Sequence, residues 1–151
     1  QLASADDLES AMETLRAFKN SQVLRVAASD ITGQFPIAEV SNQLTYIAEV
    51  CVSYALDFAW RDLVAKYGTP RCADGAGTRE VRVAVIGYGK LGGWELGYGS
   101  DLDLVFLHDS AGEAQRTDGE RPIENPVFLG RLAQRLVHIL STTTPSGIAY
   151  E

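Results

Sequence analysis

Two long stretches in the first half of the chain carry apolar residues at the three- and four-residue spacing of an amphipathic helix. The first runs from Ser4 to about Ala28 and the second from Ser41 to about Tyr67. Their apolar positions are Leu8, Met12, Leu15 and Phe18 in the first stretch and Leu44, Ile47, Cys51, Tyr54 and Phe58 in the second. Between them, residues 29–36 are rich in Ser, Asp, Gly and Pro, which favour turns. We therefore expect two antiparallel helices that pack together.

The second half of the chain has a different pattern, which begins at a helix stop formed by Gly68 and Pro70. Residues 69–80 contain Pro and Gly without apolar periodicity, so they are predicted to form a connecting loop. Residues 81–87, VRVAVIG, are rich in β-branched side chains, and residues 101–108, DLDLVFLH, are apolar at almost every position. Both of these short segments are therefore expected to be β-strands.

Another amphipathic helix is expected from Asn125 to about Ser141, because a Pro stands in its first turn and apolar residues follow at helical spacing. After a polar turn, residues 148–151, IAYE, are expected to begin a third strand. The sequence thus predicts an α+β chain, with a helical segment at residues 1–70 and a second unit at residues 71–151.

Composition and charge narrow the functional classes. The 151 residues are 46% apolar, which is enough for the core of a compact domain. A formal net charge of -7 and a pI near 4.8 argue against a nucleic acid partner, whose phosphates would be repelled. No apolar run is long enough to span a bilayer, and the N-terminus lacks signal-peptide features. We therefore expect no membrane contact and a cytoplasmic location.

Two aspartates stand at the start of the second predicted strand. Because alternate side chains of a strand share a face, Asp101 and Asp103 should point the same way, with Leu102 and Leu104 on the other face. Neighbouring carboxylates repel each other and resist burial, so a cation should offset them, and Mg²⁺ prefers such oxygen ligands. Metal ions held in this way can position the phosphates of a nucleotide. The simpler alternative is that Asp101 caps a turn and Asp103 lies on a sheet edge.

The connection between the two strands, residues 87–100, has the glycine-rich sequence GYGKLGGWELGYGS. Glycines such as Gly89, Gly92 and Gly93 allow backbone N–H groups to approach phosphate oxygens closely. Lys90 can add a positive charge. The alternative is an ordinary glycine-rich connection with a solvent-facing lysine.

The first glycines of this loop also match the GxGxxG pattern of dinucleotide-binding folds, with Asp109 about 22 residues after the first of them. A Rossmann-type module, however, needs a crossover helix of about ten residues, and the rest of the loop is too short and is interrupted by glycine. That alternative also leaves Asp101 and Asp103 unexplained. A Walker motif is excluded because Leu91, rather than Ser or Thr, follows Lys90.

The run GYGKLGGWELGYGSDLDLVFLHD, residues 87–109, strongly resembles the glutamine synthetase adenylyltransferase family, large bifunctional enzymes with two nucleotidyltransferase domains. Residues 131–138, RLAQRLVH, and 141–151, STTTPSGIAYE, are also similar to that family, and residues 15–33 resemble the helices that precede its second catalytic unit. The sequence of the glycine-rich loop and the ending LHD, residues 107–109, resemble the C-terminal, adenylylating half of the family more than its N-terminal, deadenylylating half.

This resemblance implies transfer of AMP from ATP to a tyrosine of glutamine synthetase, on a truncated sheet of the DNA polymerase β type. It also implies glutamine synthetase as a partner, a PII-type signal protein as a regulator of the parent enzyme, and Mg²⁺ or Mn²⁺ as the metal. The predicted site residues are Asp101 and Asp103 as catalytic metal ligands, and Gly89, Lys90, Gly92, Gly93 and Ser100 close to the nucleotide phosphates.

In the family that this chain resembles, a third catalytic Asp follows shortly after a segment like GIAYE, residues 147–151, where this sequence stops. That acid is often proposed to help deprotonate the attacking hydroxyl. We therefore expect this piece alone to be inactive or nearly so. A non-catalytic regulatory fragment is a further alternative, and it predicts neither nucleotide binding nor transfer.

Overall fold

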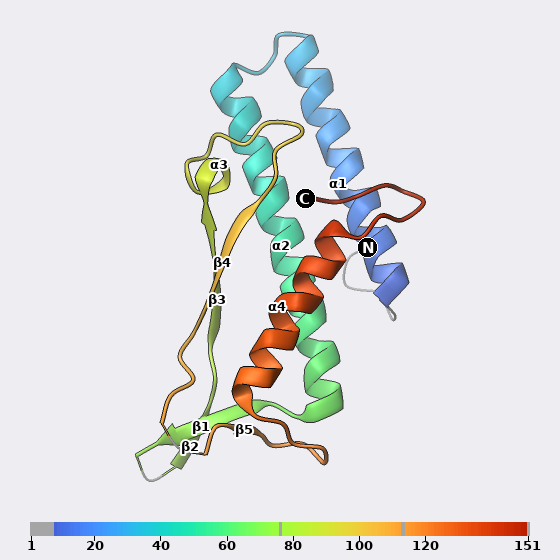
Figure 1. The fold of residues 1–151 in the computed structure, drawn as a ribbon. Coiled ribbons are helices and arrows are strands. Elements are labelled where there is room, and N and C mark those ends of the chain that lie inside the picture. The colour runs from blue at the N-terminus through green and yellow to red at the C-terminus, as the bar shows by residue number, and fades with distance from the viewer. Residues whose placement is uncertain (1–7, 76, 113, 151) are drawn as a thin grey trace.

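The computed structural model describes residues 8–75, 77–112 and 114–150. Its N-terminal part consists of two antiparallel helices, α1 (Leu8–Ile31) and α2 (Ile37–Tyr67), which run side by side in Figure 1. The predicted helical hairpin is therefore confirmed. Neither these helices nor any other described helix combines the length and the apolar character needed to cross a membrane.

The ends of the two helices follow from local backbone chemistry. α1 continues to Ile31, beyond the predicted end at Ala28, and its predicted start at Ser4 lies outside the described residues. Pro36 holds an extended backbone directly before α2, with a φ of -68° and a ψ of 156°. Gly68 ends α2 with a φ of 83°, a conformation that glycine adopts at low cost.

Residues 69–80, predicted to be a loop, instead contain two antiparallel strands, β1 (Pro70–Asp74) and β2 (Gly77–Glu80). β1 also pairs with β5 (Arg116–Thr117), so the strand order of this sheet is β2-β1-β5. The prediction fails here because β2 and the end of β1 are largely exposed, and backbone pairing rather than an apolar pattern holds them.

β3 (Val83–Tyr88) and β4 (Asp103–His108) form a separate two-stranded antiparallel sheet and confirm the two predicted strands. The connection between them contains only the short helix α3 (Gly89–Gly92). A Rossmann-type module needs parallel strands joined by a full crossover helix, so the antiparallel pairing contradicts that alternative.

α4 (Asn125–Ser141) has the predicted bounds and packs against α2. An edge-to-face contact between Trp60 of α2 and Phe128 of α4, with ring centroids 5.4 Å apart, joins the two helices. With these helices and two small antiparallel sheets, the described part of the chain confirms the α+β class.

The third strand expected at residues 148–151 is not formed in the described residues 148–150. The N–H groups of Ala149 and Tyr150 both donate to the carbonyl oxygen of Leu140, so the chain folds back over the end of α4. Both side chains are buried in the helical core. Burial against helices, rather than strand pairing, therefore accounts for the apolar character of this segment.

A buried arginine of α1 binds the same segment through hydrogen bonds. Arg16 is fully buried, and its guanidinium donates to the carbonyl oxygens of Met12 at 2.8 Å, Gly147 at 2.8 Å and Ile139 at 3.2 Å. Because the last carbonyls of a helix lack partners within the helix, Arg16 satisfies part of the C-terminal end of α4. The helical hairpin thereby fixes where the chain runs after α4.

One hydrophobic cluster joins the helical segment to the rest of the described chain. It includes Leu15 of α1, Leu44 of α2 and Leu132 of α4, together with Leu91 and Leu96 of the glycine-rich loop. The loop is therefore anchored in the same core as the helices. The division of the chain into residues 1–70 and 71–151 stays a prediction.

Candidate active site

The acidic end of β4 has the alternation expected of a strand. Asp101 and Asp103 are exposed, as is Val105, whereas Leu102 and Leu104 are half-buried and pack against the core. The helices cover the inner face of β3 and β4, so Asp103 belongs to the open face of this small sheet, and Asp101 is exposed directly before β4. Their carboxylates are accessible from solvent.

No hydrogen bond or ion pair joins the side chain of Asp101 or Asp103 to another described residue, so no cation of the described chain offsets the two carboxylates. Among the described residues, no group of three or more His, Cys, Asp and Glu side chains could hold a metal ion. The described chain therefore offers a pair of carboxylates with open coordination positions, which suits a cation that also binds the oxygens of a substrate.

Gly89 leaves room for the carboxylate of Asp103. A Cβ atom added at Gly89 would lie 2.2 Å from Oδ2 of Asp103, far inside contact distance. Gly89 also has a φ of 54°, in the left-handed region that other residues adopt only at a cost. The structure thus brings together two of the predicted site residues, one from the loop and one from β4, in a cradle that a larger residue at position 89 would fill.

The predicted phosphate loop begins with the single helical turn of α3. The N–H of Gly93 donates to the carbonyl oxygen of Gly89 at 3.0 Å, and a Cβ atom at Gly92 would lie 2.6 Å from the carbonyl oxygen of Gly87. Both glycines are exposed, as is Lys90, which has no ion pair with another described residue. The structure leaves the Lys90 ammonium group available to a ligand without placing it against Asp101 or Asp103.

Ser100 closes a turn directly before Asp101. Its Oγ accepts a hydrogen bond from the N–H of Gly97 at 3.0 Å, and its own N–H donates to the carbonyl oxygen of Gly97 at 3.2 Å. The hydroxyl keeps its proton free to donate to a ligand. No hydrogen bond joins Ser100 to Gly92 or Gly93, so its predicted contact with phosphate would need the ligand as a bridge.

The loop between α3 and β4 is also attached to the helical hairpin. The Trp94 ring meets Tyr46 of α2 edge to face, with centroids 5.1 Å apart, and the Tyr98 hydroxyl donates to Oδ2 of Asp30 at 2.8 Å. Leu96, between them, is buried. The contacts of Tyr46 and Asp30 with this loop were not predicted from the sequence, because no local motif at either position indicates a partner far away in the chain.

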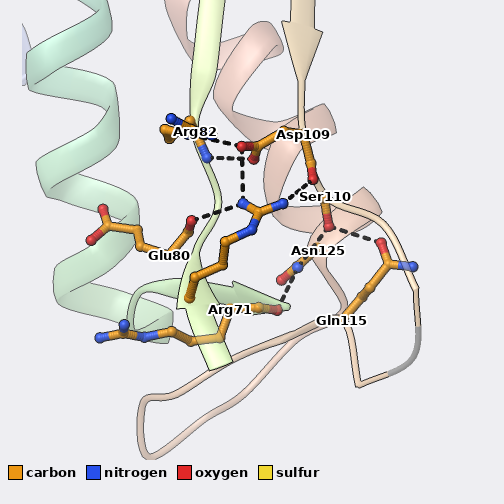
Figure 2. A network of polar contacts seen from close by, with 8 residues as sticks. Arg71, Glu80, Arg82, Asp109, Ser110, Gln115 and Asn125 are labelled. Atoms are coloured by element: carbon orange, nitrogen blue, oxygen red, sulfur yellow. Dashed lines mark hydrogen bonds and ion pairs between the residues drawn. The ribbon is translucent and has the colours of Figure 1, made fainter. Parts of the chain in front are cut away.

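A third aspartate, Asp109, lies at the opposite end of the β3–β4 pair (Figure 2). It accepts hydrogen bonds from the backbone N–H of Arg82 at 2.8 Å and from Nε of Arg82 at 2.9 Å, and Nη1 of Arg79 lies 2.9 Å from it. The Arg82 N–H and the two guanidinium groups hold the pKa of the Asp109 carboxyl well below its usual range. Asp109 therefore serves structure, and the dinucleotide-binding role considered from its spacing is wrong.

Asn125 extends this network toward β1. Its side chain is fully buried, and Nδ2 donates to the carbonyl oxygen of Arg71 at 2.7 Å and to Oγ of Ser110 at 2.9 Å. Figure 2 shows Asn125 between these two groups, at the start of α4. The network thus ties β1, the end of β4 and α4 together at the end of the sheet far from Asp101 and Asp103.

Comparisons with known proteins agree over nearly the whole chain. The sequence model of a family described as "Glutamate-ammonia ligase adenylyltransferase" matches residues 1–151. Curated relatives from Thioalkalivibrio sulfidiphilus, Nitrosococcus oceani and Hahella chejuensis are each called "Bifunctional glutamine synthetase adenylyltransferase/adenylyl-removing enzyme". They are 53%, 53% and 54% identical to this chain over 146 residues, which cover 97% of the chain. The same residues span only 15% of the length of each relative.

Proposed function

Because the chain belongs to the glutamate-ammonia ligase adenylyltransferase family, we propose that it supplies the metal-binding strand and phosphate loop of a site that transfers AMP from ATP to a tyrosine of glutamine synthetase. The observation that carries this proposal is the pair of exposed carboxylates, Asp101 and Asp103, beside a glycine that makes room for one of them. Since the chain spans 15% of its relatives, the activity belongs to the longer enzyme.

In this proposal Asp101 and Asp103 bind Mg²⁺ or Mn²⁺ from the open face of the sheet, and the sheet is part of a nucleotidyltransferase core of the DNA polymerase β type. Gly89 keeps Asp103 in place without a side chain of its own. Gly92 and Gly93 let the backbone of the loop come close to the phosphates of ATP, and the Ser100 hydroxyl and the Lys90 ammonium group contact them. These two groups donate hydrogen bonds or carry positive charge, as an anionic ligand requires.

The reaction replaces the phosphoanhydride bond between the α- and β-phosphates of ATP with a phosphodiester bond to tyrosine. The tyrosine oxygen attacks the α-phosphorus of ATP and forms a new P–O bond, the bond from that phosphorus to the bridging oxygen breaks, and pyrophosphate leaves while the phenolic proton passes to a base or to water. A divalent ion held by the two carboxylates would offset the negative charge on the phosphates. The described residues contribute mainly by positioning, which is the main requirement of such transfers.

The name of the relatives includes an adenylyl-removing activity as well, so the site could serve either reaction of the longer enzyme. We assign it to the adenylylating half because the glycine loop and the LHD ending, residues 87–108 and Asp109, resemble that half more closely. A cytoplasmic location and regulation by a PII-type signal protein belong to the same proposal.

The test uses the full-length enzyme that contains this chain, with glutamine synthetase, Mg²⁺ and ATP labelled in its α-phosphate. We expect the double substitution Asp101→Asn/Asp103→Asn to abolish labelling of glutamine synthetase on tyrosine while adenylyl removal persists. Loss of removal with intact labelling would instead assign the chain to the other half. If the double variant retained both activities, the proposed function would be wrong, and a non-catalytic role would take its place.

A further inference from the structure

We infer that the helical hairpin of α1 and α2 positions the catalytic strand through the segment 94–100, with the Tyr98–Asp30 hydrogen bond as its outermost attachment. This inference rests on the proposed function, because it concerns how Asp101 is held for the transfer. It makes Tyr98 and Asp30 positioning residues, which act on the reaction through the loop and touch neither ATP nor the acceptor.

Alternate side chains of the segment contact the helices. Trp94 meets Tyr46, Leu96 is 1% exposed within the common core, and Tyr98 donates to Asp30. The three contacts are spaced two residues apart along the segment, with Trp94 and Tyr98 in turns on either side of Leu96. The segment is therefore attached at successive points along its length instead of looping freely from α3 to β4.

The backbone conformation of Trp94 is strained, which indicates that its contacts hold the segment in place. Trp94 has a φ of 60°, which costs a non-glycine residue free energy and persists only where the surroundings hold it. The edge-to-face contact with Tyr46 supplies such a hold. The first attachment thus fixes the direction in which the chain leaves α3.

The last attachment lies next to the catalytic strand. After Tyr98 the chain makes the turn closed by the hydrogen bonds between Gly97 and Ser100, and Asp101 follows at once. The Asp30 carboxylate that receives the Tyr98 hydroxyl belongs to the last turn of α1. Release of this bond would free the turn while Leu96 remains buried, so the effect should be confined to the region around Ser100 and Asp101.

A loop that is held in place before ATP binds lowers the ordering cost of binding. If the attachment is lost, the competent loop becomes a smaller fraction of the population, and the apparent affinity for ATP falls by that fraction. Once ATP is saturating the loop is ordered by the ligand, so the rate of transfer should change little. The predicted signature is therefore a higher KM for ATP with a nearly constant kcat.

The experiment compares Tyr98→Phe, Asp30→Ala and Asp30→Asn in the full-length enzyme. Tyr98→Phe and Asp30→Ala should each raise the KM for Mg²⁺–ATP about threefold to tenfold, the range expected for one net hydrogen bond. Their kcat should stay within about twofold of the unsubstituted enzyme, and combining them should add nothing further. Asp30→Asn should behave almost like the unsubstituted enzyme, because its amide oxygen still accepts the bond.

The matched control is Tyr67→Phe. Tyr67 lies at the end of α2, its ring packs beneath Arg131 at 5.0 Å, and its hydroxyl has no hydrogen bond with another described residue. This variant removes the same atom from a tyrosine away from the loop. It should leave the KM for ATP unchanged.

Hydrogen–deuterium exchange gives a readout that does not depend on activity. Without ATP, Tyr98→Phe should increase exchange in residues 94–103 and leave α2 unchanged, and saturating ATP should restore protection. Unchanged exchange and unchanged KM in Tyr98→Phe would overturn the inference, even if Asp101→Asn/Asp103→Asn abolishes transfer. Transfer that survives the double aspartate substitution would overturn the proposed function instead, so the two failures are distinct.

Discussion

Aspartates lie at both ends of the β3–β4 pair, but their surroundings differ. At one end Asp101 and Asp103 are exposed and have no partner among the described residues, and Gly89 is shaped to admit a carboxylate. At the other end Asp109 receives two arginines and a backbone N–H. The aspartates at the start of β4 therefore lack side-chain partners among the described residues, whereas the aspartate after its end has several.

This difference indicates what each end does. Where the chain supplies its own cations, the carboxylate connects neighbouring strands, as Asp109 does by binding Arg79 of β2 and Arg82 directly before β3. Where the described chain supplies none, the two exposed carboxylates remain available to an external cation. Adenylyl transfer should therefore depend on the open end, and stability on the satisfied end.

The largest expected effect is on the rate of transfer. In the full-length enzyme, Asp101→Asn or Asp103→Asn alone should lower kcat about a thousandfold, since a metal ion contributes several kcal/mol to such a reaction. Asp109→Asn should leave kcat nearly unchanged. Steady-state kinetics with glutamine synthetase as acceptor measures all three, and a large loss with Asp109→Asn would break the distinction between the two ends.

Substitution of Gly89 should have the next largest effect on kcat. Gly89→Ala should lower kcat about tenfold to a hundredfold, because the added methyl group pushes the Asp103 carboxylate aside and strains the backbone. Gly99→Ala is the matched control in the same loop, since a Cβ atom there meets nothing within 4 Å and its φ is not in the left-handed region. Equal effects of the two substitutions would show that the cradle around Asp103 is unimportant.

Low pH should weaken the network of hydrogen bonds and ion pairs around Asp109. The pKa of Asp109 is lowered in the folded chain, so its contribution to stability is present above the unfolded pKa of about 3.9 and is lost as pH falls through the folded value. Thermal unfolding of the 151-residue chain, followed by circular dichroism, should show a Tm that falls more steeply below about pH 4 than in Asp109→Asn. Identical slopes would contradict the role of Asp109 as an ionised partner of the arginines.

The smallest expected effect separates the two arginines. Arg79→Gln should lower the Tm more than Arg82→Gln, because the Arg79 side chain is 32% exposed and also donates to backbone oxygens, whereas that of Arg82 is 85% exposed. The same unfolding measurement at neutral pH compares them, and added salt should reduce the difference. A larger effect of Arg82→Gln would instead make the Arg82 side chain the main partner of Asp109.

The sequence predicts those parts of the molecule in which local pattern and tertiary structure agree. Helical spacing predicts α1, α2 and α4, and the apolar strand pattern predicts β3 and β4. The alternation of Asp101 and Asp103 with Leu102 and Leu104 predicts the exposed aspartates and the half-buried leucines. The remaining site roles, those of Lys90 and Ser100 among them, stay predictions.

The parts that sequence reasoning missed depend on partners far away in the chain. β1 finds its partners in β2 and β5 without an apolar alternation, and residues 148–150 are apolar because they cover helices. Asp30 and Tyr98 are 68 residues apart, and no local pattern connects them. Contacts of this kind arise from packing of the whole chain, which periodicity does not encode.

The most direct test of the open carboxylate pair is a calorimetric titration of Mn²⁺ into the full-length enzyme with a non-hydrolysable ATP analogue present. We predict saturable Mn²⁺ binding whose stoichiometry is unchanged in Asp109→Asn and is lowered in Asp101→Asn/Asp103→Asn, because the site of this chain is lost while the other nucleotidyltransferase domain is retained. Mn²⁺ and analogue binding that survive the double substitution unchanged would contradict the assignment of these two aspartates as the metal ligands.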